Sequence, residues 1–324
     1  MINLKHITRL NSIYWAYAIK KNVQTKYPPY RLWIEPTSIC NLKCAMCPNK
    51  SLEKSQLGMM DFDLFRKAID EAKDFVHDIN IHHRGEALLH KRLFDMIRYA
   101  KQRDVKLKLH TNATMLNEKN AKELLESGLD FISFSFDGLD KDTYERYRVG
   151  ARYKITVKNI KDFLRLKKVL KKKKPFTVLE LIDYIKHDNK YSLNELSEFK
   201  RQFDELSLDK LVVKNPHNFG GNIHLDATNG ANAYSPCTYL WHSLVVLWNG
   251  DILPCTQDFN GELVLGNLKD KSLEEIFHGE ELMSLRKKAL TGDLSKLHPC
   301  SHCDMIKRDR ILGVPVNSFR YLQK

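Results

Sequence analysis

Apolar and polar positions alternate along residues 30–215 in a way that predicts strands and helices in turn. Six short apolar runs, rich in β-branched and aromatic residues, predict strands. These runs are residues 30–34, 79–83, 105–110, 131–136, 176–184 and 210–214. Between them, apolar residues recur at helical spacing in residues 62–75, 93–102, 117–127, 155–170 and 193–206. This alternation predicts a parallel sheet with helical crossovers, although periodicity alone does not separate an open sheet from a barrel.

The two ends of the chain follow a different pattern. Residues 1–29 place apolar side chains on a rough helical face, for which packing against the main domain is favoured over a membrane surface. Gly- and Asn-rich residues 216–234 predict a connector. Beyond it, a hairpin is expected in which Asn249 and Gly250 form a type I′ turn. The expected parts are an N-terminal helical extension (1–29), an α/β domain (30–215), the connector and a small C-terminal domain (235–324).

Composition and charge limit the classes of function. With 324 residues and 43% hydrophobic content, the chain is long enough to bury a real core. It has no run of about 18 apolar residues and no signal-peptide pattern, so we expect a cytoplasmic protein without a transmembrane segment. The net charge is +13, but its densest run, residues 167–174, has no interleaved aromatic residues. We therefore expect a solvated lysine-rich surface and no nucleic-acid partner.

The seven cysteines fall into two groups, and none is left over. A disulfide framework is not expected in a chain of this kind. The first group, in the segment CNLKCAMC, is Cys40, Cys44 and Cys47. The second group is Cys237, Cys255, Cys300 and Cys303. Two ligand-like sets that use every cysteine predict two metal centres.

The first group has one cysteine too few for a closed metal site. A structural zinc ion takes four ligands, of which the fourth could come from elsewhere in the chain, but C-x3-C-x2-C is not an ordinary zinc-knuckle spacing. A [4Fe–4S] cluster held by three thiolates keeps one iron open to a non-protein ligand, and an open position is typical of a catalytic metal site. The loop also follows the first predicted strand, where parallel α/β folds place their sites. The spacing therefore predicts a catalytic iron–sulfur cluster.

The segment IEPTSICNLKCAMCPN, residues 34–49, resembles the signature loop of the radical SAM enzymes. In that family the open iron binds S-adenosyl-L-methionine (SAM), whose reductive cleavage gives a 5′-deoxyadenosyl radical that abstracts a substrate hydrogen. The resemblance covers residues 30–215 and implies a partial (β/α)6 TIM-like barrel. It also implies an external one-electron reductant such as flavodoxin or ferredoxin.

Two turns after later strands resemble SAM-binding motifs of that family. Arg84-Gly85-Glu86 is similar to a Gly-Gly-Glu turn whose backbone contacts the SAM amino group, with Arg84 in place of the first glycine. Thr111-Asn112 is similar to the start of a Thr-Asn-Gly turn, with Ala113 in place of the glycine. The resemblance thus implies SAM contacts at Gly85, Glu86 and Asn112.

Three further residues are implied as SAM contacts by the same resemblance. Ser135 begins a Ser-x-Asp-Gly segment whose serine helps to bind the SAM carboxylate. Arg148 lies in a segment similar to Arg-x-Gly. Met46 takes the place of an aromatic residue whose backbone faces adenine.

The second cysteine group supplies four thiolates, which by themselves suit a structural zinc ion. In a chain that also carries the loop above, they resemble the SPASM/twitch extension, and their number is similar to that of the shorter twitch form. This implies an auxiliary [4Fe–4S] cluster with four protein ligands. A cluster without an open iron would pass an electron and not bind substrate.

An electron acceptor beside a substrate radical implies a net two-electron oxidation. Twitch-type relatives oxidise an alcohol of an aminocyclitol or sugar, whereas peptide-modifying relatives use the same cofactors for other products. Because only residues 1–29 precede the expected barrel, too few for a peptide-leader-binding domain, a small molecule is favoured over a peptide. Radical epimerisation needs a further hydrogen donor and is a weaker alternative. A zinc-stabilised basic binding protein is the remote alternative.

No residue is singled out as the proton acceptor, so the catalytic residues are left open. Asp258 and Asp183 are candidates by position, with a structural role favoured for both. His82 and His83 beside the second turn are candidates for lining the substrate site, with a polar strand end as an equal alternative.

Overall fold

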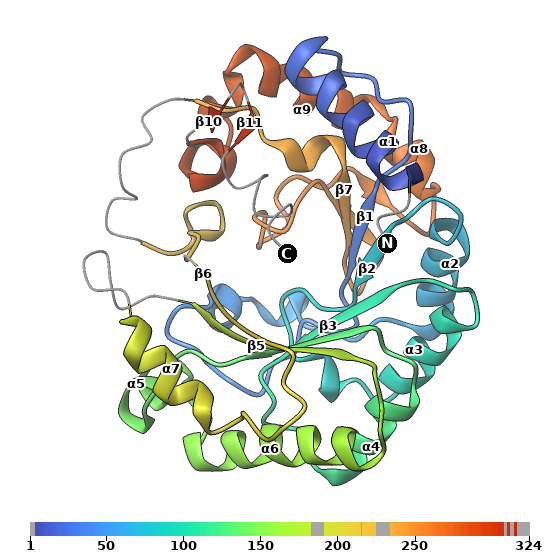
Figure 1. Cartoon of the computed structure of the whole chain (residues 1–324). Coiled ribbons are helices and arrows are strands. Elements are labelled where there is room, and N and C mark those ends of the chain that lie inside the picture. Colours follow the sequence, from blue (N-terminus) through green and yellow to red (C-terminus); the bar gives the residue numbers. More distant parts are fainter. Residues whose placement is uncertain are drawn as a thin grey trace.

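The computed structural model describes residues 4–182, 191–214, 216–224, 234–307, 310–311 and 314–315. Its main sheet contains the six predicted strands. They are β1 (Arg31–Ile34), β2 (Asp78–Asn80), β3 (Leu107–Thr111), β4 (Phe131–Ser135), β5 (Phe176–Ile182) and β6 (Lys210–Lys214). All neighbours among them pair in parallel in the order β6-β5-β4-β3-β2-β1. Figure 1 shows these strands along an open arc with helices outside it, so the predicted partial barrel is confirmed.

The connecting helices agree with the predicted ones to within a few residues. They are α2 (Phe62–Ala72), α3 (Leu93–Lys101), α4 (Glu118–Glu126), α6 (Tyr153–Val169) and α7 (Leu193–Arg201). Side chains at the N-termini set where two of them begin, because Asp61 and Asn117 accept hydrogen bonds from backbone N–H groups of α2 and α4. The sequence did not predict α5 (Lys141–Tyr147), since Tyr144 is its only buried residue and leaves no apolar periodicity.

The two faces of the sheet differ in polarity. The ring of Phe134 packs against α6, so Ser133 and Ser135 on either side of it face away from the helices. The strand register pairs His110 with Ser133 and Glu180 with Ser135. Partners in register point to the same face of a sheet, so these four polar residues share the concave face.

The C-terminal part continues the same sheet. Strand β7 (Ser243–Val246) pairs in parallel with β1, and β8 (Asp251–Leu253) and β9 (Gly266–Asn267) follow in antiparallel order. Because Ile34 is paired with Val246, the loop after β1 and the turn after β7 leave the sheet at the same edge. The predicted domain boundaries stay predictions, since one sheet runs through both expected domains.

The hairpin β7–β8 is confirmed, but its predicted type I′ turn is wrong. Of Asn249 and Gly250, only Gly250 has a positive φ, at 98°. The Gly250 N–H donates to the Leu247 carbonyl (3.0 Å), and the Leu247 N–H donates to the Asp251 carbonyl (2.9 Å). This is the pattern of a type I turn followed by a left-handed glycine, which needs one positive φ and not two.

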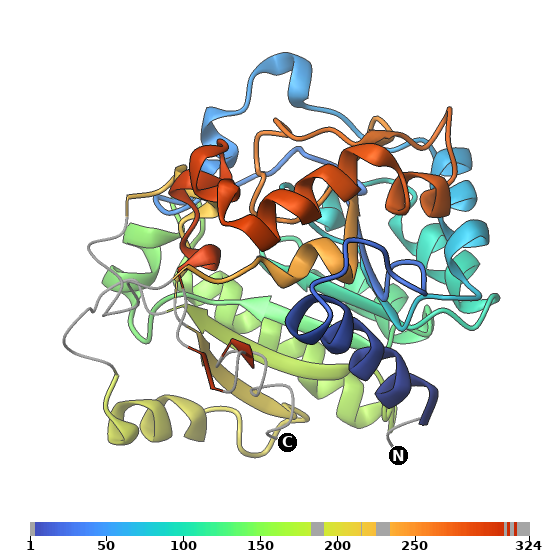
Figure 2. The same cartoon turned by 90° about the horizontal axis from the view of Figure 1, so that it is seen from above.

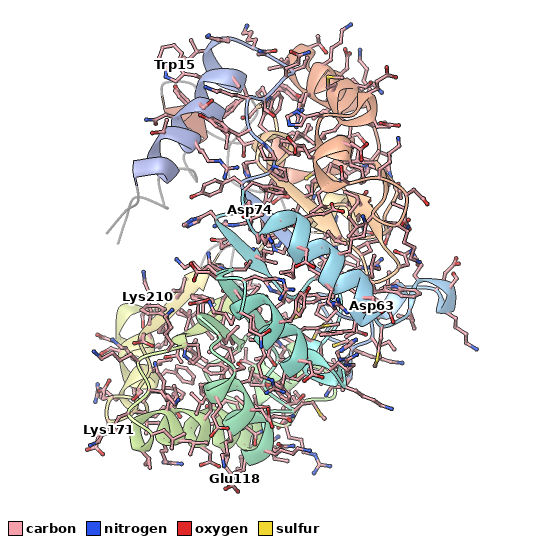
Figure 3. All side chains as sticks on the ribbon, turned by 90° about the vertical axis from the view of Figure 1, so that its right-hand side faces the viewer. Trp15, Asp63, Asp74, Glu118, Lys171 and Lys210 are labelled. Atoms are coloured by element: carbon pink, nitrogen blue, oxygen red, sulfur yellow. The ribbon has the colours of Figure 1, made fainter. Side chains whose placement is uncertain are left out.

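Helices from both chain ends lie near β7 in Figure 1, and Figure 2 shows that the N-terminal helix and the long C-terminal helix lie at different depths of that view. These helices are α1 (Leu4–Tyr14), which continues into a π-helical turn (Trp15–Ile19), α8 (Leu273–Phe277) and α9 (Glu280–Thr291). A small sheet of β10 (Arg310–Ile311) and β11 (Val314–Pro315) follows them in the sequence. The Arg9 guanidinium of the N-terminal helix donates to the Phe75 carbonyl, so the predicted packing against the α/β domain is confirmed. The Tyr17 ring also lies 5.8 Å from the Trp241 ring in the C-terminal part. Trp15 points outward and is 53% exposed (Figure 3). None of the described helices is long and apolar enough to cross a membrane.

The lysine-rich run at the end of α6 is solvated, with one exception. Lys171 lies at the outer edge of the molecule (Figure 3). Lys167, by contrast, is only 3% exposed, and its Nζ lies 2.7 Å from Asp209 Oδ2. The expectation of a fully solvated run is therefore wrong at this residue.

Candidate active site

The loop that carries the first three cysteines leaves β1 and is held from both sides. On one side, the Thr37 hydroxyl donates to the Gly58 carbonyl (2.7 Å). On the other side, the Ala45 N–H donates to the Tyr147 carbonyl (2.9 Å) at the end of α5. These bonds fix the loop through groups other than the cysteine thiols, which stay available as ligands.

The thiols of Cys40, Cys44 and Cys47 lie within electrostatic reach of one another. Burial raises the pKa of Cys40 to about 11, with smaller contributions from the charges of Glu86, Cys44 and Cys47. Burial also raises the pKa of Cys44 and of Cys47. Thiols kept neutral in this way become thiolates only beside a strong positive charge, such as the irons of a cluster. The three residues therefore fit the predicted [4Fe–4S] cluster.

The four cysteines of the second group converge from separate parts of the chain. Burial raises the pKa of Cys255 strongly, and the charges of Cys237, Cys303 and Cys300 raise it further. Cys255 follows β8, whereas the Cys303 N–H donates to the Cys300 carbonyl (3.0 Å) in a late 3-10 turn. Cys255 and Cys303 are buried, and Cys237 and Cys300 are half-buried. Four such thiols fit a cluster whose ligands are all protein side chains.

Gly85 is packed against the backbone of the cysteine loop. A Cβ atom at this position would lie 2.3 Å from the Thr37 carbonyl oxygen and 2.5 Å from the Ile39 carbonyl oxygen. The next residue, Glu86, donates its N–H to the same Ile39 carbonyl (3.0 Å). The glycine therefore allows the second turn to touch the cluster loop directly.

Gly85→Ala is expected to displace the cluster loop, because both clashing atoms belong to the backbone. Overpacking of this kind costs about 1–3 kcal/mol of unfolding free energy. SAM cleavage should fall together with stability, which anaerobic denaturation and a 5′-deoxyadenosine assay would measure. Wild-type values for both would show that the loop tolerates the added methyl group.

The side chain of Glu86 is committed to the protein. Its carboxylate accepts hydrogen bonds from the Thr111 hydroxyl (2.8 Å), the Asn112 N–H (2.7 Å) and the Leu88 N–H (3.1 Å). Burial raises its pKa, and these donors oppose the rise. Glu86 therefore braces the second and third turns, and its contact with SAM stays a prediction. Asn112 Nδ2 lies 4.0 Å from Cys40 Sγ, at the edge of the first cysteine group.

Ala113 adopts a left-handed backbone with φ at 59° and is fully buried. The left-handed conformation costs a residue with a Cβ about 1–2 kcal/mol, which glycine avoids. Ala121 is also buried but lies within α4, where glycine is unfavourable. We therefore expect Ala121→Gly to lower the free energy of unfolding more than Ala113→Gly does, by at least about 1 kcal/mol. Denaturant unfolding of the two variants measures the difference. Equal losses would mean that the left-handed φ carries no cost at residue 113.

The other predicted SAM contacts lie around the same edge of the sheet. Arg148 Nη1 lies 3.9 Å from Cys44 Sγ, and its Nη2 lies 2.5 Å from Asp137 Oδ2. Ser135 ends β4 on the concave face, and Met46, which lies between Cys44 and Cys47 in the sequence, is buried. Their contacts with SAM stay predictions.

Of the two aspartates considered as proton acceptors, Asp258 and Asp183, only Asp258 lies within the described residues. The Asp258 carboxylate accepts hydrogen bonds from the backbone N–H groups of Glu262 (2.8 Å) and Leu263 (2.7 Å), one on each oxygen. This arrangement supports the structural role favoured for Asp258. Asp183 lies outside the described residues.

The sequence did not identify two buried groups that surround the site. Glu180 lies in β5 and faces the concave side. The sequence signal that could have identified it is a carboxylate inside the apolar run 176–182. Arg84 forms a two-bond ion pair with Glu35, with Nε–Oε2 at 2.7 Å and Nη2–Oε1 at 2.8 Å. No local pattern signalled this pair, because its members are 49 residues apart.

Comparison with protein families decides what these two cysteine groups are. Residues 34–187 match the Radical SAM superfamily, and residues 237–304 match the SPASM iron–sulfur cluster-binding domain. The chain belongs to the radical SAM superfamily. It is accordingly a radical SAM oxidoreductase with a SAM-binding [4Fe–4S] cluster and an auxiliary iron–sulfur cluster. The two matches also enclose both cysteine groups.

Two curated relatives are similar over most of the chain. The tungsten-containing aldehyde ferredoxin oxidoreductase cofactor-modifying protein of Pyrococcus furiosus is 27% identical, over 85% of this chain and 89% of its own. The S-adenosyl-L-methionine-dependent 2-deoxy-scyllo-inosamine dehydrogenase of Niallia circulans is 24% identical, over 84% of this chain and 92% of its own.

Solved structures share the fold. BtrN in complex with AdoMet and 2-DOIA has a TM-score of 0.58 at 22% identity, over 85% of this chain and 92% of its own. SuiB of Streptococcus suis bound to its precursor peptide SuiA has a TM-score of 0.64 at 18% identity, over 95% of this chain and 76% of its own. One of these proteins binds a small molecule and the other a peptide, so fold alone does not choose between them.

Proposed function

We propose that this radical SAM enzyme oxidises an alcohol of a sugar- or aminocyclitol-type molecule, with the auxiliary [4Fe–4S] cluster as electron acceptor. With both clusters and SAM bound, the substrate carbinol would lose a hydrogen atom to a deoxyadenosyl radical, a proton to a base and an electron to the auxiliary cluster. The products are a ketone, 5′-deoxyadenosine and methionine, and the electron that cleaves SAM would come from the external donor. Cys40, Cys44 and Cys47 would hold the first cluster, and the four later cysteines the second.

Contact between the segment after Cys255 and the second turn is the observation that carries this proposal. The Arg84 guanidinium donates to the Phe259 carbonyl (3.4 Å), and the His83 ring lies 5.9 Å from the Phe259 ring. The same second turn contacts the cluster loop through Gly85. A substrate radical formed at this turn would therefore lie near an electron acceptor. Similarity to the 2-deoxy-scyllo-inosamine dehydrogenase over 92% of that protein supports the alcohol.

A peptide substrate is the second candidate. The likeness to SuiB bound to a precursor peptide covers 95% of this chain and supports it. The small molecule remains favoured, because polar side chains on the concave face suit a compact hydroxylated ligand. We also propose a reducing, cytoplasmic setting and a flavodoxin- or ferredoxin-type electron donor, since the seven cysteines form no disulfide.

Anaerobic reconstitution followed by turnover tests the proposal. We expect about eight irons per chain, no zinc, and one 5′-deoxyadenosine for each ketone formed from a panel of aminocyclitols and sugars. Oxidation of a peptide and not of any panel member would move the assignment to the second candidate. About four irons with one zinc, and SAM cleavage without a ketone, would contradict the electron-acceptor role.

A further inference from the structure

A cluster of polar side chains occupies the concave face of the sheet beside the proposed SAM contacts. Its centre is the Glu180 carboxylate, whose Oε2 lies 2.6 Å from Lys214 Nζ and 3.8 Å from His110 Nδ1. The Ser133 hydroxyl donates to the same oxygen at 3.3 Å. The His82 ring lies 4.2 Å from the His110 ring, which extends the cluster to the second turn.

Two polar atoms of this cluster lack a partner among the described residues. The contacts of the Glu180 side chain given above all involve Oε2, and its Oε1 bonds to no described residue. His82 Nδ1 is buried and likewise makes no hydrogen bond within the described part of the chain. A buried polar atom is rarely left unpaired, so His82 Nδ1 points to a ligand that supplies the missing bond, and Glu180 Oε1 can accept a second one.

The imidazoles of His110 and His82 are neutral near pH 7. Burial lowers the pKa of His110 to about 3, with the charges of Lys214 and Lys108 as smaller causes. Burial also lowers the pKa of His82 well below its ordinary value, and the neighbouring His110 and His83 contribute. A neutral imidazole offers one donor and one acceptor, which matches hydroxyl groups and does not favour anions.

Aromatic rings lie next to these polar groups on the same face. The Phe131 ring lies 6.0 Å from the His110 ring and 6.2 Å from the Phe176 ring, with the two phenyl rings nearly parallel. A saturated ring with many hydroxyl groups has an apolar C–H face and a polar edge. The phenyl rings suit the apolar C–H face of such a ligand, and the Glu180 carboxylate and the imidazoles suit its polar edge.

The position of Glu180 relates this cluster to the reaction. Glu180 is the register partner of Ser135, and His110 precedes Asn112 by two residues. Both Ser135 and Asn112 are proposed SAM contacts. A ligand held by Glu180 would therefore lie beside SAM, where a substrate hydrogen has to be presented.

We propose that Glu180, together with His82 and His110, forms the recognition site for a polyhydroxylated ring, and that Glu180 accepts a hydrogen bond from its hydroxyl or ammonium group. This inference rests on the proposed function and specifies the substrate class. Lys214 is the present partner of Glu180, but it is 47% exposed on the edge strand β6, so a ligand can replace it at little cost.

Ligand binding to the reconstituted enzyme with SAM tests the proposal. The probes are 2-deoxy-scyllo-inosamine, scyllo-inositol, glucosamine and a control peptide. We expect a ring probe to bind, and E180Q to weaken it about 10- to 100-fold, since a hydrogen bond to a charged group is lost. SAM affinity should stay unchanged. The matched control is E123Q, whose carboxylate pairs with Arg98 outside the sheet and should leave both affinities unchanged.

Lys214→Met gives a second test with the opposite sign. Removing the competing cation should tighten the binding of the inosamine about two- to fivefold if the ammonium group faces Glu180, and should leave scyllo-inositol unchanged. Equal tightening of both probes would assign the contact to a hydroxyl group. Weaker binding of every probe would overturn the assignment, because Lys214 would then be the contact.

Other outcomes overturn the inference about Glu180 and do not decide the proposed oxidation, which the turnover assay tests separately. If no ring probe binds, or if E180Q binds the ring as tightly as the wild type, Glu180 is not the recognition residue. If E180Q weakens only SAM, the cluster belongs to the SAM site. A peptide oxidised with stoichiometric 5′-deoxyadenosine would keep the oxidation and exclude the ring class.

Discussion

Arg84→Met is expected to lower the free energy of unfolding by about 3–5 kcal/mol. Arg84 is 5% exposed and its partner Glu35 is fully buried, with two charge-assisted bonds between them. Removing the guanidinium leaves the Glu35 carboxylate buried without a counter-charge. Glu35 also accepts a hydrogen bond from the Trp248 N–H (3.4 Å), so the loss reaches the C-terminal part of the sheet.

Denaturant unfolding under anaerobic conditions measures this effect. The matched control is Arg98→Met, because Arg98 pairs with Asp95 and Glu123 at 46% exposure and should lose no more than about 1 kcal/mol. The double variant Arg84→Met with Glu35→Gln should recover part of the stability, since the unpaired charge is then absent. A loss below about 1 kcal/mol for Arg84→Met alone would mean that Glu35 finds another partner or takes up a proton.

The sequence predicted the barrel because its signals are local. Each strand is an apolar run, and helices such as α2 and α4 begin at residues with capping side chains. The helix α9 was not predicted, although it is twelve residues long. Its buried stripe contains Arg286, whose guanidinium donates to the Leu240 carbonyl (2.8 Å), and a buried charge interrupts the apolar period.

Long-range pairing explains most of what the sequence did not predict. The pairing of β1 with β7 joins residues more than 200 positions apart, and no local pattern encodes it. The same holds for the burial of Lys167 against Asp209 and for the contact of Arg84 with Phe259. The cysteines are different, because metal ligands are fixed in type and spacing and are readable before the fold is known. Glu180 became a candidate only once the register placed it opposite Ser135.

Cys44→Ala and Cys255→Ala are expected to separate the two proposed cluster functions. Cys44→Ala removes a ligand of the cluster with the open iron, so SAM cleavage should fall below about 1% of the wild-type rate, while about four irons remain. Cys255→Ala removes a ligand of the auxiliary cluster and should also leave about four irons. In this variant SAM cleavage should continue, whereas ketone formation should fall at least about 100-fold, because the substrate electron has no acceptor.

Iron content, 5′-deoxyadenosine and ketone, measured on the same samples, distinguish the two variants. Ser301→Ala is the control for disturbance of that turn, because Ser301 is half-buried and lies between Cys300 and Cys303 in the sequence. Among the described residues, the Ser301 hydroxyl bonds to His302 Nδ1 (3.0 Å), its neighbour in the chain. Full ketone formation in Cys255→Ala would contradict the electron-acceptor role and leave the auxiliary cluster a structural one. Loss of SAM cleavage in Cys255→Ala, with the first cluster intact, would show that the second turn transmits the damage, through the Arg84–Phe259 contact, to the loop that holds Cys44.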